Sequence, residues 1–570
     1  MVSPNLIKKK EKSLSLTLSA KRLFQLIYIK KNGLEKNTKD SSNNIVVSSM
    51  TSKLTLVYEK IRNAVDYDDD HLLRKNAIKR IFKRHMIIEG LLKKAKSEEM
   101  ALHLMTELIQ AGYLENNKIL ESKIQEVANI FEKYIKLEDL LQEKDNFFHL
   151  FFNFNKEKSR KRTQKAQKKL FKLITSLAAS EIEMNLTRDN VQQEIVLDMF
   201  EILRDTIRLP KNLPYDEDLD IQTYLAVVRN YLNYDDDLLT FAIFKYYNNR
   251  WSHDDLKTEE IEDIASKIDV IYASIQEQLK HPLKRQLDKV TKSYSLYFSI
   301  LEETIWENPM RIYDQASNNY KAFINTIKEN CEKGFAKIKK KLWRSGFRSI
   351  IYIFLTKSIF VFLLEVPAVK FFGEEINLLT LAINISFPAV LLFLMILFTW
   401  TPAQENTKKI ISGVEEIVFN EKRKAKSILL KKPAKRTLAM DISFTILYFG
   451  GFSLTIYFIV KFLTFLGFNW VSIIIFLFFL TFASFFSFRI KRDIKKFIII
   501  EPKEGFFSFI LDFFYTPIVA TGKFLSDNAS RINIFVFILD FIIEAPFRVF
   551  VDVFDSWLRY VKERKENLIS

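Results

Sequence analysis

The feature that most constrains this chain is a series of long apolar runs between residues 350 and 489, joined by short polar connections and one long basic connection. Each run is close to the roughly 20 mostly apolar residues that a helix needs to cross a bilayer. The second and fourth runs contain no charged side chain, which is unusual for a helix of a water-soluble protein. The sequence therefore predicts four membrane spans, at residues 350–371, 378–400, 442–468 and 471–488.

The composition favours an all-α protein. The chain has 570 residues, of which only 12 are Gly and 12 are Pro, far below the usual ~7% and ~5%. Folds that depend on many tight turns or on Gly-rich nucleotide loops are therefore disfavoured. The formal net charge of +17 accompanies heavy use of Lys, Asn, Ile and Phe, residues with AT-rich codons, so charge alone does not indicate a function.

Basic residues gather on one side of the predicted spans. The segments 336–348, 401–441 and 489–496 are rich in Lys and Arg, whereas the connections on the opposite side are short and carry few charges. Basic loops remain in the cytoplasm. We therefore expect a multi-pass protein of the plasma membrane, with transmembrane hairpins at 349–400 and 442–490, a basic cytoplasmic loop at 401–441, and both termini in the cytoplasm.

The first 49 residues are polar and irregular, apart from one short apolar cluster. We expect a disordered basic N-terminus there. Two alternatives stay open: translation can begin at Met50, where a periodic pattern starts, or the basic, Ser-containing start can be an organelle transit peptide.

Residues 50–348 show the apolar spacing of amphipathic helices. Such helices bury their apolar faces against one another, which predicts a cytoplasmic helical bundle or superhelix. A solenoid is the weaker alternative because no fixed repeat length is found. Two predicted faces are Leu120, Ile124, Val127, Phe131 and Tyr134, and Val196, Met199, Phe200, Leu203 and Ile207.

Three clusters join a tyrosine to acidic residues before an apolar helix: 67–70, 215–218 and 234–237. Near the first cluster, Asp66, Asp68 and Asp70 resemble the start of a calcium-binding EF-hand loop, but that loop, counted from Asp66, needs Gly at its sixth position and Glu at its twelfth. This chain has His71 and Ala77 there. We expect these acids to cap helix N-termini. The sequence predicts no catalytic residue, metal site or cofactor, because the histidines and the single cysteine, Cys331, have no ligand spacing.

A basic segment at 155–172 has nine Lys or Arg residues against one Glu. A solvated helix face is the commoner explanation for such a segment, and a surface that binds anionic lipid phosphates is the functional one. Nucleic acid is disfavoured as a partner because no recognition signature accompanies the charge. The candidate residues are Arg160, Lys161, Arg162, Lys165, Lys168 and Lys169.

Lys357 and Glu365 lie inside the first predicted span, where an ionised side chain is costly. They can mark an ion or proton pathway. Because residues eight apart lie about 80° apart around an α-helix, we do not expect them to pair. The alternative is that Lys357 extends towards the inner interface while Glu365 sits near the outer one, beside a kink at Pro367.

Residues 491–570 are apolar again but contain regularly spaced charges. The pattern predicts amphipathic helices that lie in the interface or re-enter the membrane. Two further spans are the alternative, giving six in place of four. The predicted polar stripe consists of Asp540, Glu544, Arg548, Asp552, Asp555 and Arg559.

These features favour a membrane-anchored scaffold or interaction protein over an enzyme. We expect its partners to be the bilayer, including anionic inner-leaflet lipid, and a protein that the sequence does not identify. Oligomerisation is left open. The alternative function is a transporter or channel component that uses the charges in the first span.

Overall fold

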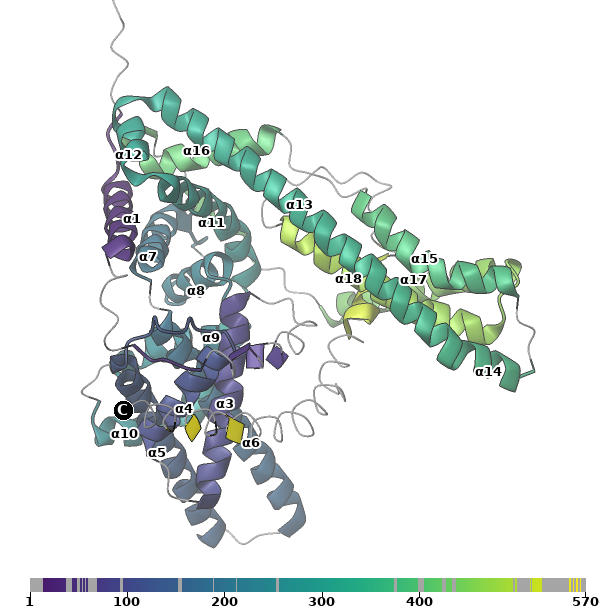
Figure 1. Cartoon of the computed structure of the whole chain (residues 1–570), viewed down its shortest axis with the longest axis horizontal. Coiled ribbons are helices and arrows are strands. Elements are labelled where there is room, and N and C mark those ends of the chain that lie inside the picture. The colour runs from purple at the N-terminus through teal and green to yellow at the C-terminus, as the bar shows by residue number, and fades with distance from the viewer. Residues whose placement is uncertain are drawn as a thin grey trace, which may run out of the picture. The chain divides into compact units, whose positions relative to one another are not determined.

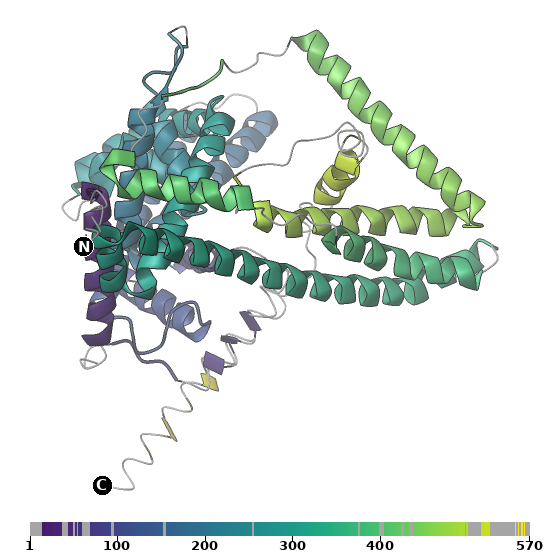
Figure 2. The same cartoon turned by 90° about the horizontal axis from the view of Figure 1, so that it is seen from above.

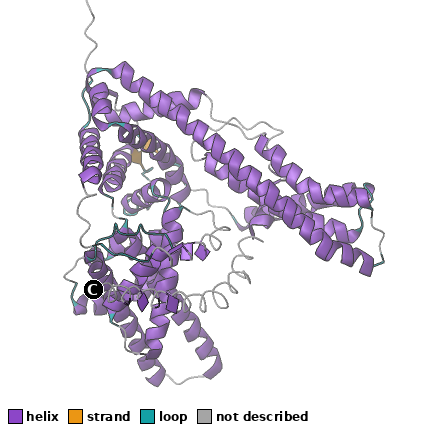
Figure 3. Ribbon diagram, viewed as in Figure 1, coloured by secondary structure: helices purple, strands orange, loops and turns teal. Residues whose placement is uncertain are grey.

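The computed structural model of the chain is mostly helical (Figures 1 and 3), and the prediction of an all-α fold is confirmed. It describes residues 14–36, 44–48, 69–92, 96–151, 156–187, 189–211, 213–252, 256–373, 377–397, 404–422, 427–432, 437–495 and 515–524, with short pieces within 52–59, at 498–499 and 513, and within 553–564. The chain divides into two compact units. We call them the helical domain, residues 21–291, 425–432 and 538–570, and the apolar-helix unit, residues 1–20, 292–424 and 433–537.

The helical domain is built from helices that each bury one apolar face. Among the faces predicted from sequence, Val127, Phe131 and Tyr134 are fully buried, whereas Leu120 lies before the helix and is exposed. The helices are α1 (Leu18–Lys36, from residue 21), α3 (Asp70–Leu92), α4 (Ser97–Gln110), α5 (Ser122–Phe151), α6 (Lys156–Leu186), α7 (Asn190–Thr206), α8 (Leu219–Tyr231), α9 (Asp236–Tyr247), η1 (Asn249–Ser252), α10 (Thr258–Leu279) and the start of α11 (Lys284–Glu307).

A short parallel pair of strands completes the helical domain. β1 (Ile207–Arg208) pairs with β2 (Ile428–Leu429), and the Leu430 N–H donates to the Arg208 carbonyl. The Gln286 side chain adds two hydrogen bonds to the backbone of Lys431. Part of the predicted basic loop at 401–441 is therefore an ordered element of this domain.

The apolar-helix unit is organised around one very long helix. α13 (Tyr320–Phe360) continues through η2 (Val361–Glu365), a π-helical turn, into α14 (Val366–Phe371). This helix is highly charged at first and apolar after residue 348. The other elements of the unit are the rest of α11, α12 (Pro309–Asn318), α15 (Leu378–Leu397), α16 (Gln404–Val418), η3 (Asn420–Lys422), α17 (Leu438–Phe465) and α18 (Trp470–Lys495).

The N-terminal segment differs from the expectation of disorder over residues 14–36. Thr17 donates from its backbone N–H to the Val418 carbonyl and from its hydroxyl to the Ile417 carbonyl. α1 then buries an apolar face that includes Leu23 and Ile27. Leu23 and Ile27 lie one turn apart on the same side of the helix. Even this short apolar cluster therefore forms a face whose packing stabilises the helix.

α16 shows how the charged half of the apolar-helix unit is packed. Its buried residues include Ile410, Val414 and Ile417, which recur at three and four positions. Gly413 lies against Tyr297, and a Cβ at this glycine would come within 2.3 Å of the tyrosine ring. The absence of a side chain therefore lets α11 and α16 approach closely.

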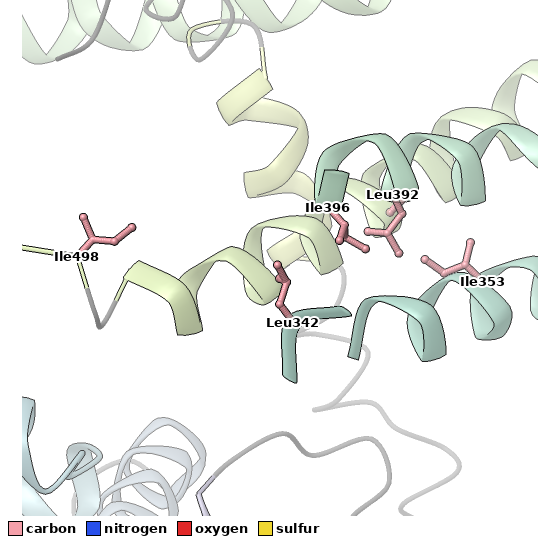
Figure 4. Close-up of a cluster of buried hydrophobic side chains, with 6 residues drawn as sticks. Leu342, Ile353, Leu392, Ile396 and Ile498 are labelled. Carbon is pink, nitrogen blue, oxygen red and sulfur yellow. The ribbon is translucent and has the colours of Figure 1, made fainter. Parts of the chain in front are cut away.

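The apolar helices pack through two clusters of buried side chains. One joins Leu342 and Ile353 of α13 to α15, α18 and Ile498 (Figure 4), where the labelled side chains of α13 and α15 point toward one another. The second joins α17 and α18 through residues such as Leu463 and Phe476. Most described side chains of α17 are exposed, and Figure 2 shows this helix diverging from its neighbours over much of its length.

Candidate functional site

The candidate site is built around Lys357 and Glu365, which the structure places together. Lys357 lies in the last turn of α13, and Glu365 ends η2. Neither side chain has exposed surface. Lys357 Nζ lies 3.8 Å from Glu365 Oε2, which is an ion pair but too long for a hydrogen bond.

This pairing corrects the expectation that the two residues do not meet. In η2 the Val366 N–H donates to the Val361 carbonyl, five residues earlier. Residues in such a wider turn advance less around the axis than α-helical residues, so Glu365 returns to the side of Lys357. Pro367 follows at once; it lacks an N–H and its ring clashes with the carbonyl four residues earlier. The irregularity expected at Pro367 thus takes the form of a π turn.

Two neutral side chains from other helices bind the Glu365 carboxylate. Asn384 of α15 donates from Nδ2 to Oε1 at 2.5 Å, and Ser472 of α18 donates from its hydroxyl to the same oxygen at 2.6 Å. Both side chains are buried. Oε1 therefore has two hydrogen bonds, whereas Oε2 faces the lysine and accepts none from the described residues.

Lys357 has few polar contacts. Its Nζ lies 4.4 Å from the centre of the Phe479 ring, a cation–π contact, and it donates no hydrogen bond to a described residue. α15 and residues 470–485 of α18 contain no ionisable side chain. Within the described part of these packed helices, Lys357 and Glu365 are each other's counter-charge.

The surface around this site is the inverse of its interior. On the same turns of helix, Ile359, Phe362 and Leu363 are exposed by 58 to 68%, while the two charged residues are fully buried. Water-soluble proteins place apolar side chains inside and charges outside. The reversed arrangement is expected where the surrounding solvent is hydrocarbon.

The two charges of the site can be identified from the sequence, whereas Asn384 and Ser472 were not predicted as their partners. An amide inside an otherwise apolar helix was visible in the sequence, yet its partner depends on how α15 packs against η2.

The other proposed groups are described only in part. In the basic segment, Lys168 and Lys169 are exposed on α6, and the side chains of Arg160, Lys161, Arg162 and Lys165 lie outside the described residues. The predicted tail stripe, Asp540, Glu544, Arg548, Asp552, Asp555 and Arg559, also lies outside them.

In two of the three acidic clusters, at least one aspartate has a structural partner. Asp235 caps α9, since its carboxylate accepts from the Leu238 N–H at 3.1 Å, which confirms the predicted capping there. Asp218 precedes α8 but instead accepts a hydrogen bond from Gln278 at 2.6 Å. His281 Nε2 lies 3.4 Å from Asp218, and its Nδ1 accepts from the Leu283 N–H. This histidine therefore joins α8 to the α10–α11 corner.

Two helices of the described chain, Tyr320–Phe371 and Leu438–Phe465, are long and apolar enough to cross a membrane. Two shorter apolar helices, Leu378–Leu394 and Trp470–Phe485, lie beside them in sequence. Comparison with protein-family models, curated proteins and solved structures finds no match to this chain.

Proposed function

We propose that this chain is a multi-pass membrane protein whose apolar helices anchor a helical domain at the cytoplasmic surface. The observation that carries this proposal is the inverted pattern of residues 350–366 in the long helix, where both charged side chains are buried and many apolar side chains are exposed. In water, the buried charges and the exposed apolar side chains would both make the folded protein less stable. In a bilayer the same arrangement exposes apolar side chains to lipid and hides the ion pair.

Helix lengths support four spans. Residues 350–371 form about 33 Å of helix and α15 about 30 Å, at 1.5 Å per residue, close to the ~30 Å hydrocarbon thickness. α17 and α18 are longer still. Exposed Lys339, Lys340 and Arg344 precede the apolar part of α13, and such a basic collar favours the cytoplasmic side.

Labelling of single cysteines in intact cells tests this topology. The natural Cys331 is buried, so it gives little background with an impermeant maleimide. We expect Phe372→Cys and Phe465→Cys to react from outside, and Lys169→Cys and Lys432→Cys to react only after the cells are opened. Labelling of positions 372 and 432 from the same side would refute the four-span arrangement.

The anchored domain is proposed to act as an interaction module that binds anionic lipid through α6. Exposed Lys168 and Lys169 support this, since each basic residue near an anionic surface contributes roughly 1 kcal/mol. The test uses full-length protein in neutral vesicles and acceptor vesicles containing phosphatidylserine. We expect salt-sensitive capture that falls roughly tenfold or more in Lys168→Glu/Lys169→Glu.

The matched control is Lys96→Glu/Lys211→Glu, which reverses two exposed lysines elsewhere in the helical domain. Absence of capture at low salt, or an equal loss in the control variant, would remove the lipid-binding role. The membrane topology would remain untouched by that result. A second candidate function, a transporter or channel component, is favoured by one observation, the burial of both charges of the first span among the packed helices.

A further inference from the structure

The buried ion pair is incompletely satisfied. A charge-assisted hydrogen bond between an ammonium and a carboxylate is about 2.7–2.9 Å long, but Lys357 Nζ and Glu365 Oε2 are 3.8 Å apart. Neither atom forms a hydrogen bond with a described residue, and neither does Asn384 Oδ1. Buried charges are stabilised only when geometry and hydrogen bonding are both good. This site therefore has unused capacity for a charged or polar ligand.

Most of the polar atoms that lack a hydrogen-bond partner among the described residues of this site are oxygens. Glu365 Oε2 and Asn384 Oδ1 are acceptors without a described donor, and the Ser472 hydroxyl, which donates to Oε1, keeps lone pairs of its own. These side chains come from η2, α15 and α18, all within the apolar-helix unit. Oxygen ligands of this kind suit a hard cation.

We propose that Glu365, Asn384 and Ser472 bind a small monovalent cation, a proton or an alkali ion, in competition with the Lys357 ammonium. The cation approaches Glu365 Oε2, and the ammonium moves away from it while remaining near the Phe479 ring. This inference goes beyond membrane anchoring and adds a cation-dependent state to the anchor. It does not require the proposed lipid binding.

No other described charge can take this role at Glu365. α15 and residues 470–485 of α18 have no ionisable residue, and in residues 349–366 of the long helix Lys357 and Glu365 are the charged ones. Lys370, Lys461 and Lys523, on the neighbouring segments, are exposed. The lysine competitor and the carboxylate can therefore be changed separately.

The experiment measures the thermal midpoint of the purified full-length protein in sodium, potassium or choline chloride at equal ionic strength, and in choline chloride across a pH series. A bound cation raises the midpoint by mass action. We expect stabilisation by one alkali ion, or by acid if the proton is the ligand, and its loss in Glu365→Gln. Ser472→Ala is the milder variant, and it should weaken the response without abolishing folding.

Lys357→Met distinguishes a cation site from a purely structural ion pair. Without the competing ammonium, the cation concentration at half-saturation should fall by at least about tenfold. Lys461→Met, which changes an exposed lysine of α17, should respond like the natural protein. If the Lys357→Met midpoint is lowered equally in every salt and at every pH, the proposal is overturned. Because the measurement is made on purified protein, its failure would leave the proposed topology standing.

Discussion

Two lysines of the described chain, Lys75 and Lys357, have 1% or less of their surface exposed, one in each structural unit. Lys75 of α3 contacts both Asp235 and Asp237 at the start of α9. Lys79, one turn later, also binds Asp237 at 2.7 Å. Lys357 has the single carboxylate of Glu365, at 3.8 Å.

The difference lies in what surrounds the acids. The side chains of Asp235 and Asp237 are 33% and 24% exposed, so water stabilises their charge on one side while the lysines bind on the other. Glu365 has no exposed surface, and its further partners are neutral. A buried lysine can thus belong to a satisfied surface network or to an isolated pair. Only in the isolated pair does removal of one partner leave a buried charge with neither a counter-ion nor water.

Asp237 shows the effect of its network on acidity. Burial by itself raises the pKa of this carboxyl, but Lys75 and Lys79 outweigh it and lower the pKa from 3.8 to about 2. The folded domain therefore favours the charged form of Asp237 over the protonated form.

The largest expected effect is that of Lys357→Met in choline chloride at neutral pH. Removal of one partner from a buried pair typically costs about 3–5 kcal/mol, because Glu365 then stays charged without a counter-ion or must take up a proton. The loss of stability is measured from the temperature at which the Cys331 thiol becomes reactive, because this thiol is buried in α13 of the same unit. Adding Glu365→Gln should restore most of the stability, and a double variant as unstable as the single one would contradict this explanation.

Lys75→Met should cost less, roughly 1–3 kcal/mol. The methionine fills a similar volume, Lys79 still binds Asp237, and water reaches both acids. Hydrogen exchange of the amides in α3 and α9 measures the local stability. A loss larger than that of Lys357→Met would mean that solvent access to the acids does not distinguish the two clusters.

Acidification should weaken the helical domain through Asp237. Because the folded pKa of this carboxyl is depressed, its stabilising contribution of roughly 2 kcal/mol is complete above about pH 4 and disappears as the pH falls towards 2. Exchange of the first α9 amides followed between these values checks it. In Asp237→Asn the same pH change should have a smaller effect on those amides.

The smallest effects separate capping from mere acidity in the 234–237 cluster. Asp235→Ala removes the cap of α9 and one contact to Lys75, with an expected loss of about 1–2 kcal/mol. Asp236 is exposed and its side chain has no such contact, so Asp236→Ala should stay within about 0.5 kcal/mol. Equal losses in urea unfolding would show that the cap itself contributes little.

Much of the fold could be predicted from local patterns. The spacing of Val127, Phe131 and Tyr134 identified a buried helix face, and the acids before α9 identified its cap, because both depend on residues within a few turns. The apolar runs indicated the long helices for the same reason. The order near Thr17 could not be predicted, since it depends on Ile417 and Val418, about 400 residues away in the chain. In the same way, Lys30 of α1 pairs with Asp189, which lies 159 residues away.

The candidate site could likewise be predicted from the sequence only in part. The sequence by itself determined that two charges lie inside an apolar helix and that a proline follows them, because these are facts of composition and order. Only the tertiary structure decided that the charges meet, since a regular helix would keep them about 80° apart and the π turn brings them together. Packing of α15 and α18 then selected Asn384 and Ser472 as partners, because a hydrogen bond depends on where helices cross rather than on where residues stand in the chain.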